Sequence, residues 1–394
     1  MRSKFLLLAL ILFVGSPVFA QVDLINQVID NKSENAKANF HFETVVNIET
    51  TPIENQGASG TCWSYSTNSF LASEMKSLGK QPIPLSKMYT ARHVYMEKAI
   101  TYVRMHGHLN FGQGGEPHDV INMYEKYGTM PESAYTGLQY GTKSNNFGEM
   151  FAALKGILEG VVKNPNGKLT NSWKDAFNSV LDAYLGPVPE NFEYKGKTYT
   201  PKSFAKEVVG IQPNQYVEFI SQISTPYWEK AMMMVPDNWA FQWDWNIPMD
   251  DITKIIDNAL ENGYSVAWGT DVSEPYFSWS NGIAYIPATP IKEMTSEQKN
   301  EMFKGPKPEM NITAEMRQKA FDNYKTTDDH GMQIIGIAKD QNGKEWYIIK
   351  NSWGSGNDYK GYLFVTKNYV KYKTTSFLVN KNGIPKDISK KLNI

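Results

Sequence analysis

The sequence predicts an α+β fold in which a helical N-terminal lobe faces a β-rich C-terminal lobe, with a mainly helical insertion between them. Two stretches near the N-terminus, one after Cys62 and one over 85–103, carry apolar residues at helical spacing. From residue 264 onward, short runs of β-branched and aromatic residues are separated by Gly or Asn turns, which indicates strands. Between 147 and 245 the composition shifts toward Asn, Lys and aromatic residues, as expected for an inserted unit.

The predicted elements follow from local signals. Alternating apolar residues over 41–48 predict a strand, and Gly79 and Gly128 are placed to end helices that start near residues 62 and 118. The apolar face of 250–262 predicts a further helix, closed by Gly263. Further short strands are predicted over 264–269, 282–286, 332–338, 346–350, 361–366 and 376–379.

The 394 residues divide into a leader over 1–20, a helical lobe over 21–146, a mainly helical insertion over 147–249 and a β-rich lobe over 250–394. Arg2 and Lys4 precede an apolar run that ends at Val14, and small residues lead to Ala20, which is the layout of a signal peptide. The run is too short for a permanent anchor. We therefore expect cleavage after Ala20 and export to the periplasm or the exterior of a bacterial cell, without a stable membrane anchor.

Composition excludes some classes of function. The 40 basic and 41 acidic side chains nearly cancel, so nothing in the global charge favours nucleic acid or an anionic membrane. Cys62 is the single cysteine, which rules out an internal disulfide. A free cysteine in an exported protein needs a reason, and catalysis is the one we favour.

Cys62 follows a turn rich in small residues, Asn55-Gln56-Gly57-Ala58-Ser59-Gly60-Thr61, and begins a helical pattern. The N–H groups and the dipole at a helix N-terminus stabilise a thiolate, so this is a suitable position for a nucleophile. A lone cysteine is otherwise a small core residue, and the two interpretations of Cys62 alone carry equal weight.

Two stretches of the β-rich lobe supply what a nucleophilic thiol lacks. His330 in Asp328-Asp329-His330-Gly331 can accept the thiol proton and return it to a leaving amine. Asn351 in Lys350-Asn351-Ser352-Trp353-Gly354 can orient that imidazole. Gln56 is the candidate amide donor to a developing oxyanion.

Other motifs are weaker. Gly114 and Gly115 precede a helix but lack the spacing of a phosphate loop, so we expect them to allow close approach of another backbone. His106 and His108 form an H-x-H pair that no nearby Cys or carboxylate completes. The sequence therefore predicts no metal site and no cofactor.

The motifs N-Q-G-x-S-G-x-C-W, D-H-G-M and K-N-S-W-G resemble the three motif blocks of the papain-like cysteine peptidases. The resemblance implies a papain-like two-lobed fold and hydrolysis of peptide bonds through an acyl-enzyme. Matched by position, it implies Cys62 as nucleophile, His330 as its acid–base partner, Asn351 as the residue that orients His330, Gln56 as oxyanion donor, Trp353 as the shielding indole, and Gly114 with Gly115 as the pair along which substrate backbone lies.

Within this family the chain is similar to the branch of bleomycin hydrolase and bacterial aminopeptidase C, in the G-x-C-W form and in the long interval between Cys62 and His330. The similar aminopeptidases end in an arm that enters the cleft and restricts cleavage to chain ends. Here few residues follow Val379, and Lys390 and Lys391 would repel a substrate ammonium. The resemblance thus favours an aminopeptidase acting on peptides, and it leaves open a papain-like endopeptidase and assembly into a homo-oligomer. A peptide-binding protein without turnover is the alternative from another class.

Overall fold

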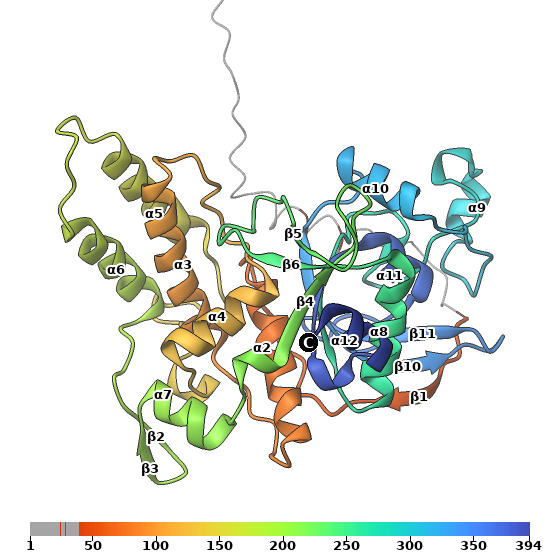
Figure 1. Cartoon of the computed structure of the whole chain (residues 1–394), viewed down its shortest axis with the longest axis horizontal. Coiled ribbons are helices and arrows are strands. Elements are labelled where there is room, and N and C mark those ends of the chain that lie inside the picture. The colour runs from red at the N-terminus through yellow and green to blue at the C-terminus, as the bar shows by residue number, and fades with distance from the viewer. Residues whose placement is uncertain (1–23, 25–27, 29–38) are drawn as a thin grey trace, which may run out of the picture.

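The computed structural model describes residues 39–394, together with Leu24 and Val28. The predicted leader over 1–20 lies outside these residues. Within them, a helical lobe and a β-rich lobe lie side by side, and α2 (Cys62–Ser77) runs between them (Figure 1). None of the described helices is long and apolar enough to cross a membrane.

The helical lobe is built on α2, whose first fourteen residues are all buried. Its neighbours begin at defined caps: Ser86 Oγ accepts from the Tyr89 N–H at the start of α3, and Pro117 occupies the first turn of α4. Of the neighbouring helices, α3 (Lys87–Arg104) and α4 (Pro117–Tyr127) pack on α2, whereas α5 (Gly148–Val162) and α6 (Ser172–Leu185) pack on α3.

Residues 147–249 do not pack as one helical unit. The first part extends the helical lobe, where α6 packs on α3 and α5, and a hairpin of β2 (Phe192–Tyr194) and β3 (Lys197–Tyr199) follows. The second part joins the main sheet, because β4 (Tyr216–Ile220) pairs with β13 (Thr374–Asn380) and Phe219 stacks on Phe377 at 5.2 Å. The aromatic residues that mark this segment in the sequence thus serve two different cores.

The described strands outside that hairpin form one eleven-stranded sheet. Its order is β5-β6-β4-β13-β7-β10-β11-β12-β9-β8, and β1 pairs separately with β10. The strands not yet located are β1 (Glu43–Asn47), β5 (Lys230–Met232), β6 (Trp243–Asn246), β7 (Val266–Thr270), β8 (Phe277–Ser278), β9 (Ile283–Ala284), β10 (His330–Lys339), β11 (Glu345–Lys350) and β12 (Tyr362–Thr366).

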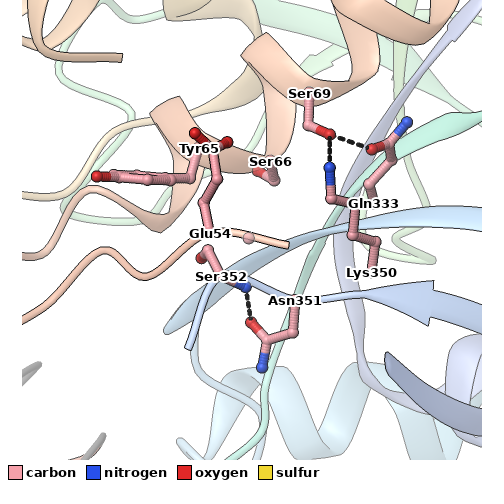
Figure 2. Close-up of a pocket in the computed structure, with 9 residues that line it drawn as sticks. Glu54, Tyr65, Ser66, Ser69, Gln333, Lys350, Asn351 and Ser352 are labelled. Carbon is pink, nitrogen blue, oxygen red and sulfur yellow. Dashed lines mark hydrogen bonds between the residues drawn. The ribbon is translucent and has the colours of Figure 1, made fainter. Parts of the chain in front are cut away.

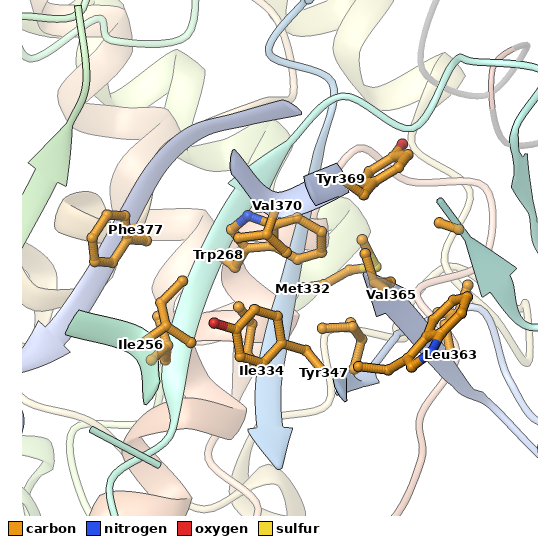
Figure 3. Packing of buried hydrophobic residues seen from close by; sticks show 14 of the residues in the cluster. Ile256, Trp268, Met332, Ile334, Tyr347, Leu363, Val365, Tyr369, Val370 and Phe377 are labelled. Carbon is orange, nitrogen blue, oxygen red and sulfur yellow. The ribbon is translucent and has the colours of Figure 1, made fainter. Parts of the chain in front are cut away.

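Both faces of the central strands are covered. Trp268 and Ile334 pack with Ile256 of α8 (Met249–Glu261) in a large apolar core (Figure 3). Ala267, the neighbour of Trp268 in sequence, points the other way and joins the core around α2. The remaining helices are α7 (Pro201–Phe204), α9 (Ser296–Asn300), α10 (Ala314–Asp322), α11 (Lys367–Lys373) and α12 (Lys386–Leu392).

A buried polar layer joins α2 to the sheet. Ser69 Oγ donates to Gln333 Oε1 and accepts from Lys350 Nζ, both at 2.7 Å (Figure 2). Lys350 Nζ also donates to the carbonyl of Thr51 at 2.6 Å. Burial lowers the pKa of Lys350 to about 8. These bonds fix the end of β11, and therefore Asn351, relative to the helix that begins with Cys62.

Candidate active site

The turn before α2 presents Cys62 at the first position of the helix. Gly57 has a φ of +62°, and a Cβ atom there would lie 2.6 Å from the Asn145 carbonyl oxygen, so only glycine fits. Gln113 braces the turn, because its Oε1 accepts from the Gly60 N–H at 2.7 Å and its carbonyl accepts from Trp63 Nε1 at 3.0 Å. The Cys62 side chain is only 4% exposed.

His330 begins β10 and lines the same cavity as Cys62. Its Nε2 lies 2.8 Å from Asn351 Oδ1, which also accepts from the Ser352 N–H at 2.7 Å. Because that oxygen only accepts, His330 carries its proton on Nε2 and leaves Nδ1 free to act as a base. The Trp353 ring lies 4.4 Å from the imidazole, so water is excluded from the bond between His330 and Asn351.

Burial opposes charge on both reacting groups. It raises the pKa of the Cys62 thiol to about 12, although backbone hydrogen bonds to Gly331 and Trp63 act in the opposite direction. It lowers the pKa of His330 to about 4, against the effect of the Asn351 hydrogen bond. Burial in this closed state therefore favours the neutral thiol and the neutral imidazole over their charged forms. This differs from the ready-made ion pair that a helix N-terminus suggests, because the cavity excludes water.

The Gln56 side chain is held from both ends of its amide, by Ser352 and by Ser59 of the turn that precedes Cys62. Its Oε1 accepts from Ser352 Oγ and its Nε2 donates to the Ser59 carbonyl, each at 2.7 Å. The side chain is 1% exposed and does not line the cavity itself. One N–H of the amide remains for an oxyanion, next to the backbone N–H of Cys62.

Gly115 lines the cavity, and a side chain from a distant segment covers Gly114 just before it. A Cβ atom on Gly114 would lie 1.8 Å from Asp237 Oδ2, so the carboxylate of Asp237 rests directly on this glycine. Asp237 belongs to the loop between β5 and β6, and Asn110 Nδ2 donates to its Oδ1 at 3.2 Å. The loop is also tied down through Trp239, whose Nε1 donates to Asp119 Oδ2 at 2.9 Å.

Carboxylates surround the nucleophile on this side, and none of them is among the site residues predicted from sequence. The cavity holds about 20 Å³, room for about one water, and Glu116, Asp237, Asp328 and Asp329 line it beside Cys62 and His330. Glu116 directly follows the glycine pair, and Asp328 and Asp329 directly precede His330. Their closeness in sequence to site residues was therefore a signal that could have placed them at the site. Nothing near Asp237 in the sequence points to the site. His106 and His108 lie exposed in the turn after α3, away from it.

A helix-borne cysteine, a strand-borne histidine oriented by an asparagine, and a cleft between a helical and a β-rich lobe define a papain-like cysteine peptidase. The chain belongs to the peptidase C1-like family, which matches residues 14–394. It is 24% identical to aminopeptidase C of Lactococcus lactis subsp. cremoris over 376 residues, covering 84% of this chain and 81% of the relative. Cysteine proteinase 1, mitochondrial, of Saccharomyces cerevisiae strain JAY291 is 22% identical over 399 residues, covering 89% of this chain and 79% of the relative. The crystal structure of PepW from Lactobacillus rhamnosis HN001 superposes with a TM-score of 0.69 at 18% identity, covering 94% of this chain and 90% of that one.

Replacement of Asn351 by Ala tests whether this residue orients the base. We expect kcat to fall roughly 10- to 150-fold, the range for loss of a hydrogen bond of about 1.5–3 kcal/mol to a charged group. Alkylation of Cys62 by iodoacetamide at neutral pH should change little, because the thiol and the imidazole remain. Loss of alkylation in parallel with kcat would show that Asn351 holds the cysteine environment together.

The pH profile of kcat/KM should have its acid limb near pH 4. Above that value His330 is neutral and accepts the thiol proton, and below it the base is already protonated. The lowered pKa also affects stability. Between about pH 6.5 and pH 4, His330 binds a proton in the unfolded chain but not in the folded chain, so the free energy of unfolding falls as the pH drops through this range. Circular dichroism at each pH separates the two effects. An acid limb near pH 6.5 in folded enzyme would contradict the buried neutral imidazole.

Proposed function

We propose that this cysteine peptidase is an aminopeptidase, which releases residues from a free N-terminus. The observation that carries the proposal is the Asp237 carboxylate on Gly114. By resemblance, substrate backbone on the N-terminal side of the cleaved bond lies along Gly114 and Gly115. A chain that extends past the first residue meets Asp237 and the loop behind it. The anchoring of that loop through Asn110 and Trp239 supports a fixed wall.

The charge at this wall suits an α-ammonium group. Among the described cations, Lys98 lies nearest Asp237, with Nζ 3.7 Å from Oδ1, and that ammonium already donates to the Gly114 carbonyl at 2.8 Å. Glu116 is 1% exposed, and its Oε1 has no hydrogen-bond partner among the described residues. A substrate ammonium brings three donors and a positive charge to this place.

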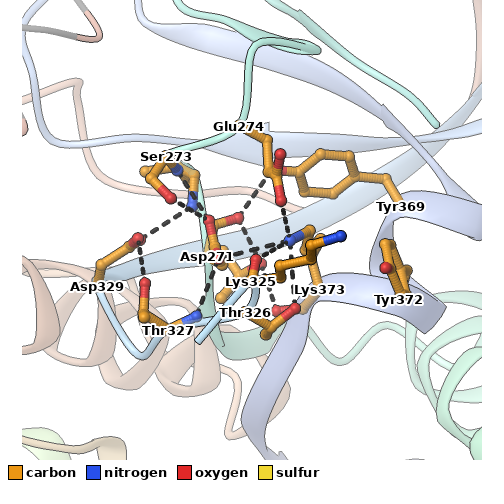
Figure 4. Close-up of polar contacts among 12 residues, drawn as sticks. Asp271, Ser273, Glu274, Lys325, Thr326, Thr327, Asp329, Tyr369, Tyr372 and Lys373 are labelled. Atoms are coloured by element: carbon orange, nitrogen blue, oxygen red, sulfur yellow. Dashed lines mark hydrogen bonds and ion pairs between the residues drawn. The ribbon is translucent and has the colours of Figure 1, made fainter. Parts of the chain in front are cut away.

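The remaining two carboxylates of the cavity, Asp328 and Asp329, differ in whether they can bind a substrate ammonium. Asp329 is occupied, because its oxygens accept from the Val272 N–H at 2.9 Å and the Thr327 hydroxyl at 3.1 Å (Figure 4). Asp328 and Glu116 line the same small cavity, and burial raises the pKa of both acids. One proton between them keeps the empty pocket from carrying two adjacent charges. An arriving ammonium can replace that proton.

The chemistry follows from the atoms at the site. Cys62 Sγ bonds to the carbonyl carbon of the first residue while His330 Nδ1 takes the thiol proton, and Gln56 with the Cys62 N–H stabilises the oxyanion. The proton passes from His330 to the leaving amine as the C–N bond breaks. Water then loses a proton to His330, and its oxygen bonds to the acyl carbon as the C–S bond breaks, which releases the residue. The proton passes from His330 to Sγ and restores the thiol. The closed cavity holds about one water, so side chains that line it around Cys62 have to move apart when the first residue binds.

Hydrolysis of one peptide as its free amine and as its N-acetyl form tests the proposal. We expect removal of single N-terminal residues from the free amine, and a rate at least about 30-fold lower for the acetylated peptide, since a desolvated charge pair contributes 2 kcal/mol or more. Mass spectrometry identifies the products. Equal rates with cuts inside the chain would make the protein an endopeptidase. Stoichiometric labelling of Cys62 without hydrolysis of either peptide would leave a peptide-binding protein.

Two replacements of Asp237 separate charge from bulk. Asp237→Asn should reduce the preference for the free amine by about 10-fold or more and still block internal cleavage, because the side chain keeps its size. Asp237→Ala should lose the charge preference and also admit acetylated or longer chains. If both variants keep the wild-type ratio of the two rates, Asp237 does not form the wall.

We also propose that the protein is exported, on the basis of Arg2, Lys4, the apolar run and the small residues up to Ala20. The full chain expressed in a bacterium should be recovered outside the cytoplasm with Gln21 as its first residue. Recovery of a cytoplasmic protein that still begins at the leader would refute export.

A further inference from the structure

We propose that His118, Glu218 and Asp244 form a binding site for one divalent transition-metal ion, outside the peptidase centre. His118 lies in the first turn of α4, Glu218 in β4 and Asp244 in β6. All three side chains are buried, with exposures of 4%, 6% and 3%. One candidate ligand atom from each lies within 4.8 Å of the others. A tetrahedral ion with ligands at about 2.0–2.2 Å needs them slightly closer, which small side-chain rotations provide.

The two carboxylates are brought together by the sheet itself. β4 and β6 pair in parallel with Phe219 opposite Trp245, so Glu218 and Asp244 precede paired positions and lie on the same face. Like charges opposite one another on adjacent strands destabilise a sheet. Asp119 adds a third carboxylate, with Oδ1 3.8 Å from His118 Nε2. A cation bound at this place would offset the negative charge of these carboxylates.

The described donors around the cluster leave one buried polar atom of each of the three residues without a hydrogen bond. His118 Nδ1 and its backbone N–H both bind Glu218 Oε2, at 2.9 and 3.1 Å. In the described part of the chain, His118 Nε2, Glu218 Oε1 and Asp244 Oδ2 have no hydrogen-bond partner. Lys230 lines the same cavity as His118, Glu218 and Asp244. Its Nζ lies over the Trp245 ring and forms no ion pair with the described atoms of these three residues. Each proposed ligand residue thus keeps one buried atom free.

The site is open to solvent through a cavity of about 370 Å³. That volume admits a hydrated ion and leaves room for waters that complete its coordination. One imidazole nitrogen with two carboxylate oxygens suits Zn²⁺ or Mn²⁺, whereas Mg²⁺ and Ca²⁺ favour all-oxygen sites. A bound ion would tie α4 to β4 and β6. Because Glu116 precedes the same helix, the ion would also hold that carboxylate at the peptidase cavity.

Calorimetric titration of the full chain with Zn²⁺ and, separately, Mn²⁺ tests the site. The Cys62→Ala background removes the thiol, which would bind Zn²⁺ at the peptidase centre. We expect one equivalent of ion to bind and the thermal unfolding midpoint to rise with ion concentration. Failure to bind either ion would overturn the proposal and leave a proton on His118 as the only cation of the cluster. The readout needs no peptidase activity, so its failure is distinct from failure of the proposed function.

Matched variants assign the ligands. Glu218→Gln and Asp244→Asn should each weaken the affinity by at least about 10-fold. Glu125→Gln changes a carboxylate that lines the same cavity outside the cluster and should leave the affinity unchanged. Circular dichroism in the presence of a chelator checks that each variant is folded without the ion. If one of the two ligand variants does not fold, the other one tests the site. Equal affinity in a folded ligand variant and in the parent would place the ion elsewhere and refute the site.

Discussion

Replacement of Cys62 by Ala should lower kcat for peptide hydrolysis by about 10⁴-fold or more, because the acyl-enzyme cannot form without the thiol. The side chain is small and sits at the start of α2, so the fold should survive with little loss of stability. Active-site titration and the rate for a free-amine peptide measure the effect.

Ser77→Ala at the other end of the same helix is a matched control and should retain full activity. Turnover above a few per cent in folded Cys62→Ala enzyme would remove Cys62 from the mechanism. Loss of helical signal in that variant would instead mean that the residue supports the fold, and Cys62→Ser would then be the variant to measure.

Replacement of Gln56 by Ala should lower kcat by about 10²- to 10³-fold with little change in KM, which is the usual effect of removing one oxyanion donor. The amide N–H acts on charge that develops only in the transition state, so substrate binding should be nearly unaffected. Steady-state kinetics on a free-amine peptide separate the two constants.

Ser352→Ala is a useful comparison with Gln56→Ala. The Ser352 hydroxyl donates its proton to Gln56 Oε1, so it orients the amide and does not itself donate to the oxyanion. We expect a smaller loss of kcat in this variant, since the amide is present but less firmly oriented. If Gln56→Ala raises KM and leaves kcat unchanged, Gln56 positions substrate and the Cys62 N–H stabilises the oxyanion without it.

The carboxylates that line the closed cavity also affect the reactivity of Cys62. Asp328 and Asp237 add to the rise in the Cys62 pKa that burial causes. A substrate ammonium at the wall offsets that negative charge and at the same time brings the carbonyl carbon to the thiol. The carboxylates that favour a free N-terminus should therefore also make the thiol more acidic when such a substrate is bound.

Local patterns predicted most of the elements in the correct class. The turn before Cys62, the helix after it and the helix ends at Gly79 and Gly128 depend on neighbours in sequence, so they could be predicted from sequence. The insertion over 147–249 was harder. Its second part carries aromatic residues that fit a helical lobe equally well, and only pairing of β4 with β13 places it in the sheet.

The sequence by itself determined the class of chemistry, because Cys62, His330, Asn351 and Gln56 each stand in a short motif whose local geometry the neighbouring residues impose. The tertiary structure alone decided what surrounds that chemistry. Asp237 reaches Gly114, and His118 meets Glu218 and Asp244, through strand pairings and loop contacts between residues far apart in the chain. Such contacts depend on how whole elements pack, and a spacing along one chain does not encode them. The same packing closes the cavity and disfavours charge on Cys62 and His330, which a helix N-terminus considered alone would not predict.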